Sequence, residues 1–213
     1  MQKVILITGS TDGIGFETAK VLVQQGHHVL LHGRNPSKLK NVEQQLVTLS
    51  TEAKIQSYVA DLSVLAEVDT LADEVIAEHD KIDVLINNAG VFNTPNPITK
   101  DGLDVRFAVN TVSPYHLTKR LLPLLGSSSR VVNLSSAAQA AVSIEALEGK
   151  KTLSDGDAYA QSKLAITMWT RKMAKELGST GPMVVAVNPA SLLGSKMVKD
   201  AVSYTHLRAH ETH

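Results

Sequence analysis

The sequence predicts a single α/β domain built on one doubly wound parallel sheet with helices on both faces. Short apolar runs rich in β-branched residues alternate with longer amphipathic segments along the chain, which is typical of parallel strands joined by crossover helices. The first run leads directly into a glycine-rich turn and a helical pattern. At ~150 residues per domain, a chain of 213 residues is expected to fold as one unit.

The first third of the chain predicts three strands and two helices. Residues 4–7 and 29–31 are short apolar runs, the first with the pattern of a strand buried on both faces, and residues 54–59 predict the third strand. Residues 14–25 have helical apolar spacing and end before a glycine, the usual residue after a helix. The second helix, toward residue 49, begins with an N-cap asparagine and a first-turn proline at 35–36.

The middle of the chain continues the alternation. Residues 64–79 predict a helix, residues 82–86 a strand and residues 103–125 a long helix. Residues 130–134 predict the next strand. Residues 138–157 carry two glycines and several charges without a clear period, so they are expected to form a loop or insertion.

The last predicted helix spans residues 158–177 and the last strand residues 183–187. Residues 203–213 differ in character, because they contain three of the eight histidines and resemble translated sequencing-adapter sequence. They lack the HExxH arrangement of a zinc site. We therefore expect a functional domain over residues 1–202, a non-native tail over residues 203–213, and truncation at the C-terminus.

The composition is that of a soluble globular protein, with 43% hydrophobic and 20% charged residues. Lys+Arg and Asp+Glu both number 21, which argues against nucleic-acid or anionic-membrane partners that require a cationic surplus. No apolar run approaches the ~20 residues that span a bilayer, and the N-terminus lacks the features of a signal peptide. The absence of cysteine excludes disulfides and thiolate chemistry. A cytoplasmic location is expected.

A glycine-rich turn, Thr8 to Gly15, joins the first strand to the first helix. Its glycines permit a tight turn and close approach of the backbone to a pyrophosphate, while the helix N-terminus presents N–H groups to phosphates. The turn lacks the Lys-Ser/Thr ending of a nucleoside-triphosphate loop, which disfavours phosphoryl transfer. The candidate cofactor-binding residues here are Gly9, Thr11, Asp12, Gly13, Ile14 and Gly15.

The Gly-x-x-x-Gly-x-Gly spacing of this turn resembles the short-chain dehydrogenase/reductase family. The resemblance covers about residues 3–200 and implies a Rossmann-like fold. It extends to Asp61-Leu62, where the family meets adenine with an Asp, and to the Asn-Asn-Ala-Gly signature at 87–90. The cofactor contacts implied by these motifs are Asp61, Leu62, Asn88, Ala89 and Gly90.

The end of the second strand, His32-Gly33-Arg34, indicates the type of dinucleotide. An acidic residue at this place bonds the adenosine ribose diol, whereas a cation suits a 2′-phosphate. Gly33 stands where NAD-preferring members of the family carry Asp, and Arg34 follows as in NADP-preferring members. We expect NADP, with NAD as the alternative. The explanation without a binding role is that Arg34 is an ordinary solvated surface arginine.

Tyr159 and Lys163 are the candidate catalytic pair, four residues apart on a predicted helix and therefore on one face. A cation at ~5 Å in a dielectric of ~20 stabilises phenolate by about 3 kcal/mol, which lowers the pKa of a tyrosine by roughly two units. Oxidised nicotinamide adds to this shift. Tyr159 is thus expected to act as a general acid/base, and both residues to contact the cofactor.

The family resemblance implies further site residues. Ser136 matches the substrate-orienting serine, and its distance from Tyr159 is longer than in compact members, as in retinol-dehydrogenase-like ones. Asn110 matches the fourth catalytic residue, held to bind a water linked to the lysine; stabilising a helix irregularity is the structural alternative. Pro189 is an expected cofactor contact, whereas Ala190 replaces the family's glycine and leaves Ser191 and Ser195 uncertain.

These motifs predict an NADP(H)-dependent oxidoreductase that passes a hydride between nicotinamide and a carbonyl or alcohol substrate. The alternatives are a non-catalytic dinucleotide-binding sensor and an inactive truncated fragment. We expect a small-molecule substrate, no metal and no nucleic acid, and homo-oligomers are common in the family. The remaining histidines form no triad with an acid and are interpreted as surface or packing residues: His27, His28, His32, His79 and His116.

Overall fold

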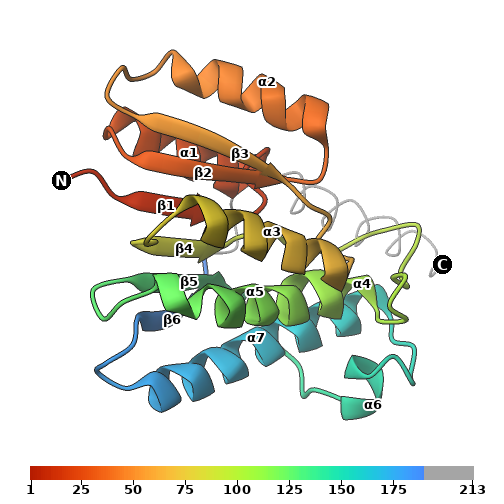
Figure 1. Cartoon of the computed structure of the whole chain (residues 1–213). Helices are drawn as coiled ribbons and strands as arrows, with labels where there is room; N and C mark the ends of the chain where they lie inside the picture. Colours follow the sequence, from red (N-terminus) through yellow and green to blue (C-terminus); the bar gives the residue numbers. More distant parts are fainter. Residues whose placement is uncertain (190–213) are drawn as a thin grey trace.

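The computed structural model describes residues 1–189 (Figure 1). Six strands, all paired in parallel, form one sheet in the order β3-β2-β1-β4-β5-β6. The strands are β1 (Val4–Ile7), β2 (His28–Gly33), β3 (Lys54–Val59), β4 (Val84–Asn87), β5 (Arg130–Leu134) and β6 (Met183–Val187). This is the Rossmann-like order, in which the direction of winding reverses between β1 and β4. The predicted fold class is confirmed.

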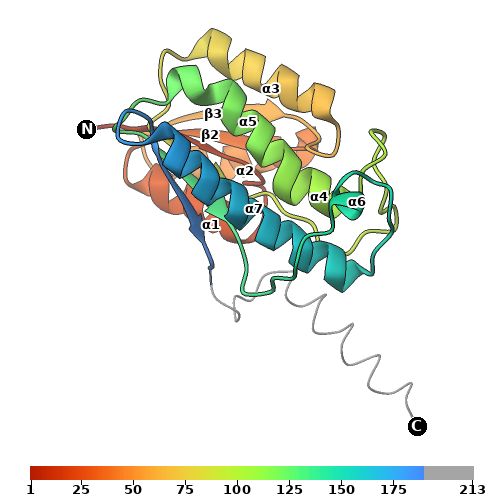
Figure 2. The ribbon, with the colours of Figure 1, turned by 90° about the horizontal axis from the view of Figure 1, so that it is seen from below.

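Two layers of helices enclose the sheet. Helices α1 (Gly13–Gln24) and α2 (Pro36–Val47) pack on one face, and α3 (Leu65–Glu78), α5 (Ser113–Leu121) and α7 (Asp155–Leu177) lie along the other (Figures 1 and 2). Right-handed crossovers place the helices in this way. None of these described helices combines the length and apolar character needed to cross a membrane.

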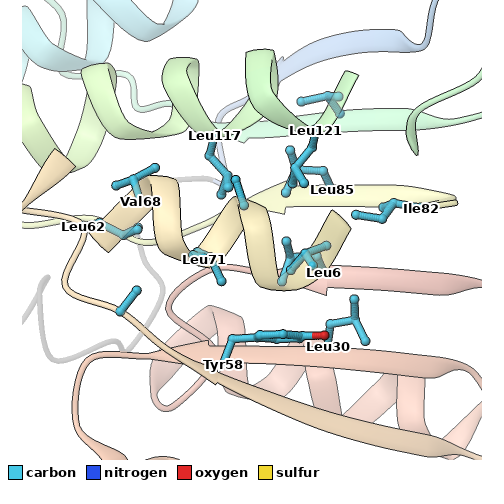
Figure 3. Packing of buried hydrophobic residues seen from close by; sticks show 14 of the residues in the cluster. Leu6, Leu30, Tyr58, Leu62, Val68, Leu71, Ile82, Leu85, Leu117 and Leu121 are labelled. Carbon is cyan, nitrogen blue, oxygen red and sulfur yellow. The ribbon is translucent and has the colours of Figure 1, made fainter. Parts of the chain in front are cut away.

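Alternate residues of the strands supply two hydrophobic cores. Leu6 of β1 faces Leu71 and Leu117 of the helices on one side (Figure 3), whereas Ile5 and Ile7 face α1 and α2 on the other. All five side chains are buried, and burying one Leu or Ile contributes ~1.5–3 kcal/mol. Because both faces of β1 are buried, its position in the centre of the sheet is firmly specified.

The segment expected as one helix over residues 103–125 is divided. A short helix α4 (Val105–Phe107) leads into a π turn (Ala108–Val112), then α5 and a 3₁₀ turn (Leu122–Leu124). The π turn contains Asn110, whose side chain bonds the backbone of another segment. The interruption depends on that tertiary contact, which apolar spacing does not encode.

Helix α7 begins at Asp155, three residues before the predicted start. Ser154 is its N-cap, and its hydroxyl accepts from the N–H of Asp157 at 3.1 Å. The Ser-x-x-Asp pattern is a capping signal that favours a helix start here, and it outweighs the low helix propensity of Gly156 in the first turn. Residues 138–157 otherwise form a loop containing one short helix, α6 (Ile144–Leu147).

Several expectations concern residues outside the described part of the chain. They are the non-native tail over residues 203–213 and the uncertain contacts Ser191 and Ser195.

Candidate active site

A cavity of about 590 Å³ opens at the carboxyl ends of the strands, around the reversal point between β1 and β4. Open α/β sheets bind ligands at this place. It extends from Arg34 and Lys38 past the glycine loop to Tyr159 and Lys163. All cofactor-binding residues predicted from the sequence line it except Gly15. The structure therefore brings the separate motifs together around one space.

The glycine loop is packed backbone against backbone. Gly9 has a φ of +65°, and a Cβ there would lie 2.8 Å from the Cα of Ala89. A Cβ on Gly15 would lie 2.3 Å from the carbonyl oxygen of Gly9. The amide of Asn88 donates to that same oxygen at 2.9 Å. Gly15 thus supports the loop from behind and does not line the cavity.

The end of the cavity near β2 carries two cations. Arg34 follows β2, and Lys38 lies in the first turn of α2, where the Asn35 side chain accepts from its N–H at 2.9 Å. The Lys38 Nζ donates to Asp12 Oδ2 at 2.8 Å. Sequence reasoning missed Lys38, although its position four residues after Arg34 and just after a helix cap could have indicated it.

Tyr159 and Lys163 share the opposite end of the cavity. The Lys163 Nζ lies 5.7 Å from the centre of the Tyr159 ring and donates to the carbonyl oxygen of Leu134 at 2.7 Å. The lysine is buried, and burial lowers its pKa to about 8. The structure thus places an ammonium beside the phenol, as the spacing on one helix predicts.

The pKa of the phenol differs from the sequence-based expectation. Burial raises the pKa of Tyr159 above its ordinary value, and a hydrogen bond with the Ser136 side chain lowers it by less. Among the described residues, no lowering of the Tyr159 pKa by Lys163 accompanies the rise caused by burial, so the expected downward shift is not found. A lowered pKa of Tyr159 stays a prediction for the site with oxidised nicotinamide, whose positive charge the expectation included.

The two serines after β5 have different surroundings. The Ser135 hydroxyl is buried, donates to the carbonyl of Lys163 at 3.1 Å and pairs with Thr167 Oγ1 at 2.7 Å. It fastens the end of β5 to α7. Ser136 is half-buried and hydrogen-bonds Tyr159. It is not among the residues that line the cavity, whereas Ser135 is, so a contact between Ser136 and a substrate oxygen stays a prediction.

Asn110 is buried behind the cavity and is not among its lining residues. Its Oδ1 accepts from the N–H of Val91 at 2.8 Å, and its Nδ2 donates to the Val91 carbonyl at 3.0 Å and to Ser162 Oγ at 3.0 Å. The side chain therefore fixes the segment after β4 against α7. Its position in the π turn agrees with the structural alternative, whereas the water relay stays a prediction.

A buried charge cluster missed by sequence reasoning lies beside α7. Arg106 is 1% exposed and forms a two-bond pair with Asp104, at 2.8 and 2.6 Å. It also bonds Asp155 in the first turn of α7. Its neighbour Phe92 packs its ring edge-on against Tyr159, with centroids 5.0 Å apart. The sequence signal that could have revealed this cluster is the charged pair Asp104 and Arg106 at the start of a segment with apolar spacing.

The donor set of the cavity fits a phosphorylated dinucleotide. Cations at one end, the N-terminus of α1 in the middle and an ammonium at the other end match an elongated anionic ligand. A phenol and a hydroxyl at the ammonium end can donate to and accept from a reacting oxygen. Over residues 1–189, no group of three His, Asp or Glu side chains is arranged to hold a metal ion.

The chain is similar to proteins of one known family. Residues 3–204 match the short chain dehydrogenase family. Retinol dehydrogenase 12 of Mus musculus is 36% identical over 195 residues, covering 90% of this chain and 62% of the relative. Polyprenol dehydrogenase of Homo sapiens is 35% identical over 192 residues, covering 86% and 58%. The chain thus spans about three fifths of the length of these relatives.

A solved structure extends the likeness to three dimensions. A metagenomic short-chain oxidoreductase in complex with NADP superposes with a TM-score of 0.73 at 29% identity, covering 95% of this chain and 90% of that one.

Proposed function

The chain belongs to the short chain dehydrogenase family of oxidoreductases, and we propose that it catalyses NADP(H)-dependent interconversion of a carbonyl and an alcohol. One observation carries the proposal: Tyr159 and Lys163 line the same cavity as the glycine loop. A phenol and an ammonium within reach of a dinucleotide site are the groups that such a reaction needs. A non-catalytic dinucleotide sensor has no need of them.

NADPH, when bound, supplies the hydride that reduces the carbonyl carbon. Arg34 and Lys38 would hold the 2′-phosphate, because paired cations bind phosphate oxygens strongly. The glycine loop and the N-terminus of α1 would hold the pyrophosphate. Lys163 has three N–H donors and uses one on Leu134, so it can also bond a ribose hydroxyl.

The protein's own contribution is to hold and move one proton. In the reduction, Tyr159 donates its phenolic proton to the substrate oxygen as the carbonyl carbon gains the hydride, and Ser136 hydrogen-bonds the same oxygen. Lys163 stabilises the phenolate that results, because an adjacent cation favours the charged form. In the reverse direction, the phenolate accepts the proton of the alcohol.

The proposal is tested by assaying NADPH oxidation with a panel of aldehydes and ketones. Tyr159→Phe is expected to lower kcat by about 10²–10⁴-fold, since general acid–base catalysis contributes that much, while NADPH affinity stays near wild type. Turnover that survives in the Phe variant would remove Tyr159 from the mechanism. NADPH binding without turnover by the wild-type chain would favour the sensor.

Cofactor choice is tested separately by Arg34→Ala and Lys38→Ala. Each variant is expected to weaken NADPH about tenfold, because each removes a charge-assisted bond to the 2′-phosphate. NADH, which lacks this phosphate, should lose little affinity. Equal losses for the two cofactors would contradict the assignment. Lys40→Ala, on α2 but outside the cavity, is the matched control.

A further inference from the structure

His32 is a buried histidine in the wall of the cavity to which the proposed mechanism gives no role. It lies in β2 and is 3% exposed. The interpretation of this residue as surface or mere packing is therefore incomplete. Both of its ring nitrogens have partners, and the partners belong to different walls of the proposed cofactor site.

One ring nitrogen contacts the glycine loop. The N–H of Gly9 donates to His32 Nδ1 at 3.1 Å. The backbone of His32 adds further bonds, since its N–H donates to Ser10 Oγ at 2.9 Å and its carbonyl accepts from the Ser10 N–H at 3.0 Å. The end of β2 is thus fastened to Gly9 and Ser10, the second and third residues after β1.

The other ring nitrogen contacts the end of β3. His32 Nε2 lies 3.1 Å from the carbonyl oxygen of Ala60, directly before Asp61, the residue expected to meet adenine. Because Nδ1 accepts, the proton of the neutral ring lies on Nε2 and is donated to Ala60. Burial lowers the pKa of His32 to about 4, so the ring holds this form at neutral pH.

The conformation of Gly9 has to be stabilised by hydrogen bonds from other residues. Its φ of +65° is one of several that glycine can adopt, and its carbonyl is already bonded by Asn88. The His32 ring supplies the matching bond on the N–H side. Together the two bonds fix both polar groups of the first glycine.

We propose that His32 is a positioning residue for the adenosine-phosphate half of the dinucleotide. Its neutral ring acts as a strut that holds the glycine loop at a fixed distance from Ala60 and Asp61, the segment after β3 that is expected to meet adenine. The inference rests on the proposed NADP(H) binding and goes beyond it, because it assigns part of the affinity to a residue that holds the walls of the cavity together. It acts through Gly9 and Ala60 and takes no part in proton transfer.

Two substitutions separate the two ends of the strut. In His32→Asn, the side-chain oxygen replaces Nδ1 and can still accept from Gly9, but the contact with Ala60 is lost. In His32→Gln, the amide nitrogen replaces Nε2 and can donate to Ala60, but Gly9 loses its acceptor. An unsatisfied buried N–H destabilises the loop conformation, so the Gln variant is expected to bind more weakly.

The probes are NADPH, followed by fluorescence titration, and adenosine 2′,5′-bisphosphate, followed by calorimetry, both with the full chain. The Gln variant should bind each probe about tenfold more weakly, and the Asn variant should stay within about threefold of wild type. The KM for NADPH should rise in the Gln variant while kcat at saturating NADPH is unchanged. His116→Gln, whose amide nitrogen can replace Nε2 in the surface bond to Asp69, is the matched control.

Affinities of the Gln variant equal to wild type, even with a lower Tm, would overturn the inference and leave His32 a packing residue. Weaker binding by the Asn variant than by the Gln variant would also overturn it, because the bond to Gly9 would then not be the one that matters. Absence of binding by the wild-type chain would overturn the NADP(H) proposal and this inference together, whereas wild-type binding with an unaltered Gln variant overturns this inference alone.

Discussion

The two halves of the sheet, β1 to β3 and β4 to β6, hold their functional residues by different means; we call them the cofactor side and the catalytic side after their proposed roles. Around β1, β2 and β3, the glycine loop is held by neutral hydrogen bonds from His32 and Asn88. Around β4 and β5, the catalytic helix is held beside buried charges, those of Arg106, Asp104 and Lys163. The cofactor side thus excludes charge from its interior, and the catalytic side keeps it there.

This difference fits the functions that we propose for the two halves of the sheet. A loop that contacts a pyrophosphate needs a fixed backbone, which hydrogen bonds and glycine packing supply. A proton-transfer site needs a charge close to the reacting group, and taking a charge out of water is costly. The catalytic side should therefore be the one where a substitution changes stability most.

The largest effect is expected at Arg106. Arg106→Met leaves the buried carboxylate of Asp104 without its partner and should lower the free energy of unfolding by ~3–5 kcal/mol, measured by urea denaturation. Arg120 also bonds two aspartates, Asp69 and Asp73, but at the surface, so Arg120→Met should cost ~1 kcal/mol or less. Similar losses in both variants would break the comparison.

The same substitution in the first turns of two helices should have opposite effects. Gly15→Ala in α1 brings a Cβ to 2.3 Å from the Gly9 carbonyl oxygen and is expected to lower the free energy of unfolding by about 3 kcal/mol. Gly156→Ala in α7 meets nothing within 4 Å and should raise it by about 0.5–1 kcal/mol. A destabilised Gly156 variant would contradict the open packing at the start of α7.

Removing the catalytic charge should stabilise the fold. Burial lowers the pKa of Lys163 from 10.5 to about 8, so below pH 8 folding bears the full cost of a buried ammonium, ~3 kcal/mol. Lys163→Met should raise the free energy of unfolding at pH 7 by about 2 kcal/mol, since the lost bond to Leu134 offsets ~1 kcal/mol.

This gain should shrink as the pH rises from 8 toward 10.5, because the folded and then the unfolded lysine becomes neutral. Lys172→Met, at an exposed position of α7, is the control and should change nothing measurable. A gain independent of pH would mean that packing and not charge is responsible.

The cofactor side should respond to acid. The pKa of His32 falls from 6.5 to about 4 on burial, so its contribution to stability is complete above pH 6.5 and is lost as the pH falls toward 4. The resulting loss between pH 7 and pH 5 is about 2 kcal/mol. His28 and His79 have lowered pKa values as well, so the measurement is the pH slope of the wild type against His32→Asn. Equal slopes would contradict the assignment.

Much of the fold was predictable from the sequence. β1, β3, β5 and β6 have the predicted bounds. The β1 and β6 sequences are wholly apolar, whereas β3 mixes apolar and polar residues. The break in the helix over residues 103–125 was not predictable, since it depends on Asn110 reaching Val91, a contact across the fold. Local apolar period cannot encode a bond between segments 19 residues apart.

The site divides in the same way. The glycine and asparagine motifs placed cavity residues because they follow strands whose ends converge at one edge. The tyrosine–lysine spacing did so because it puts both side chains on one face of α7. His32 and Arg106 were missed because their importance comes from burial and partners, which a lone histidine or arginine does not reveal. Gly15 was placed in the cavity although it packs behind it, since spacing alone does not show which face a glycine presents.

The π turn at Ala108–Val112 also changes the helical phase, so that side chains before and after it point in different directions around the helix axis. One additional residue in a turn changes the phase of all that follows by about 100°. Arg106 can therefore aim at α7 while Leu117 aims at the sheet, each without constraint from the other. A single-residue deletion here would turn one set of side chains away from its partners. We therefore expect the number of residues in this turn to matter more for the fold than the identity of each residue.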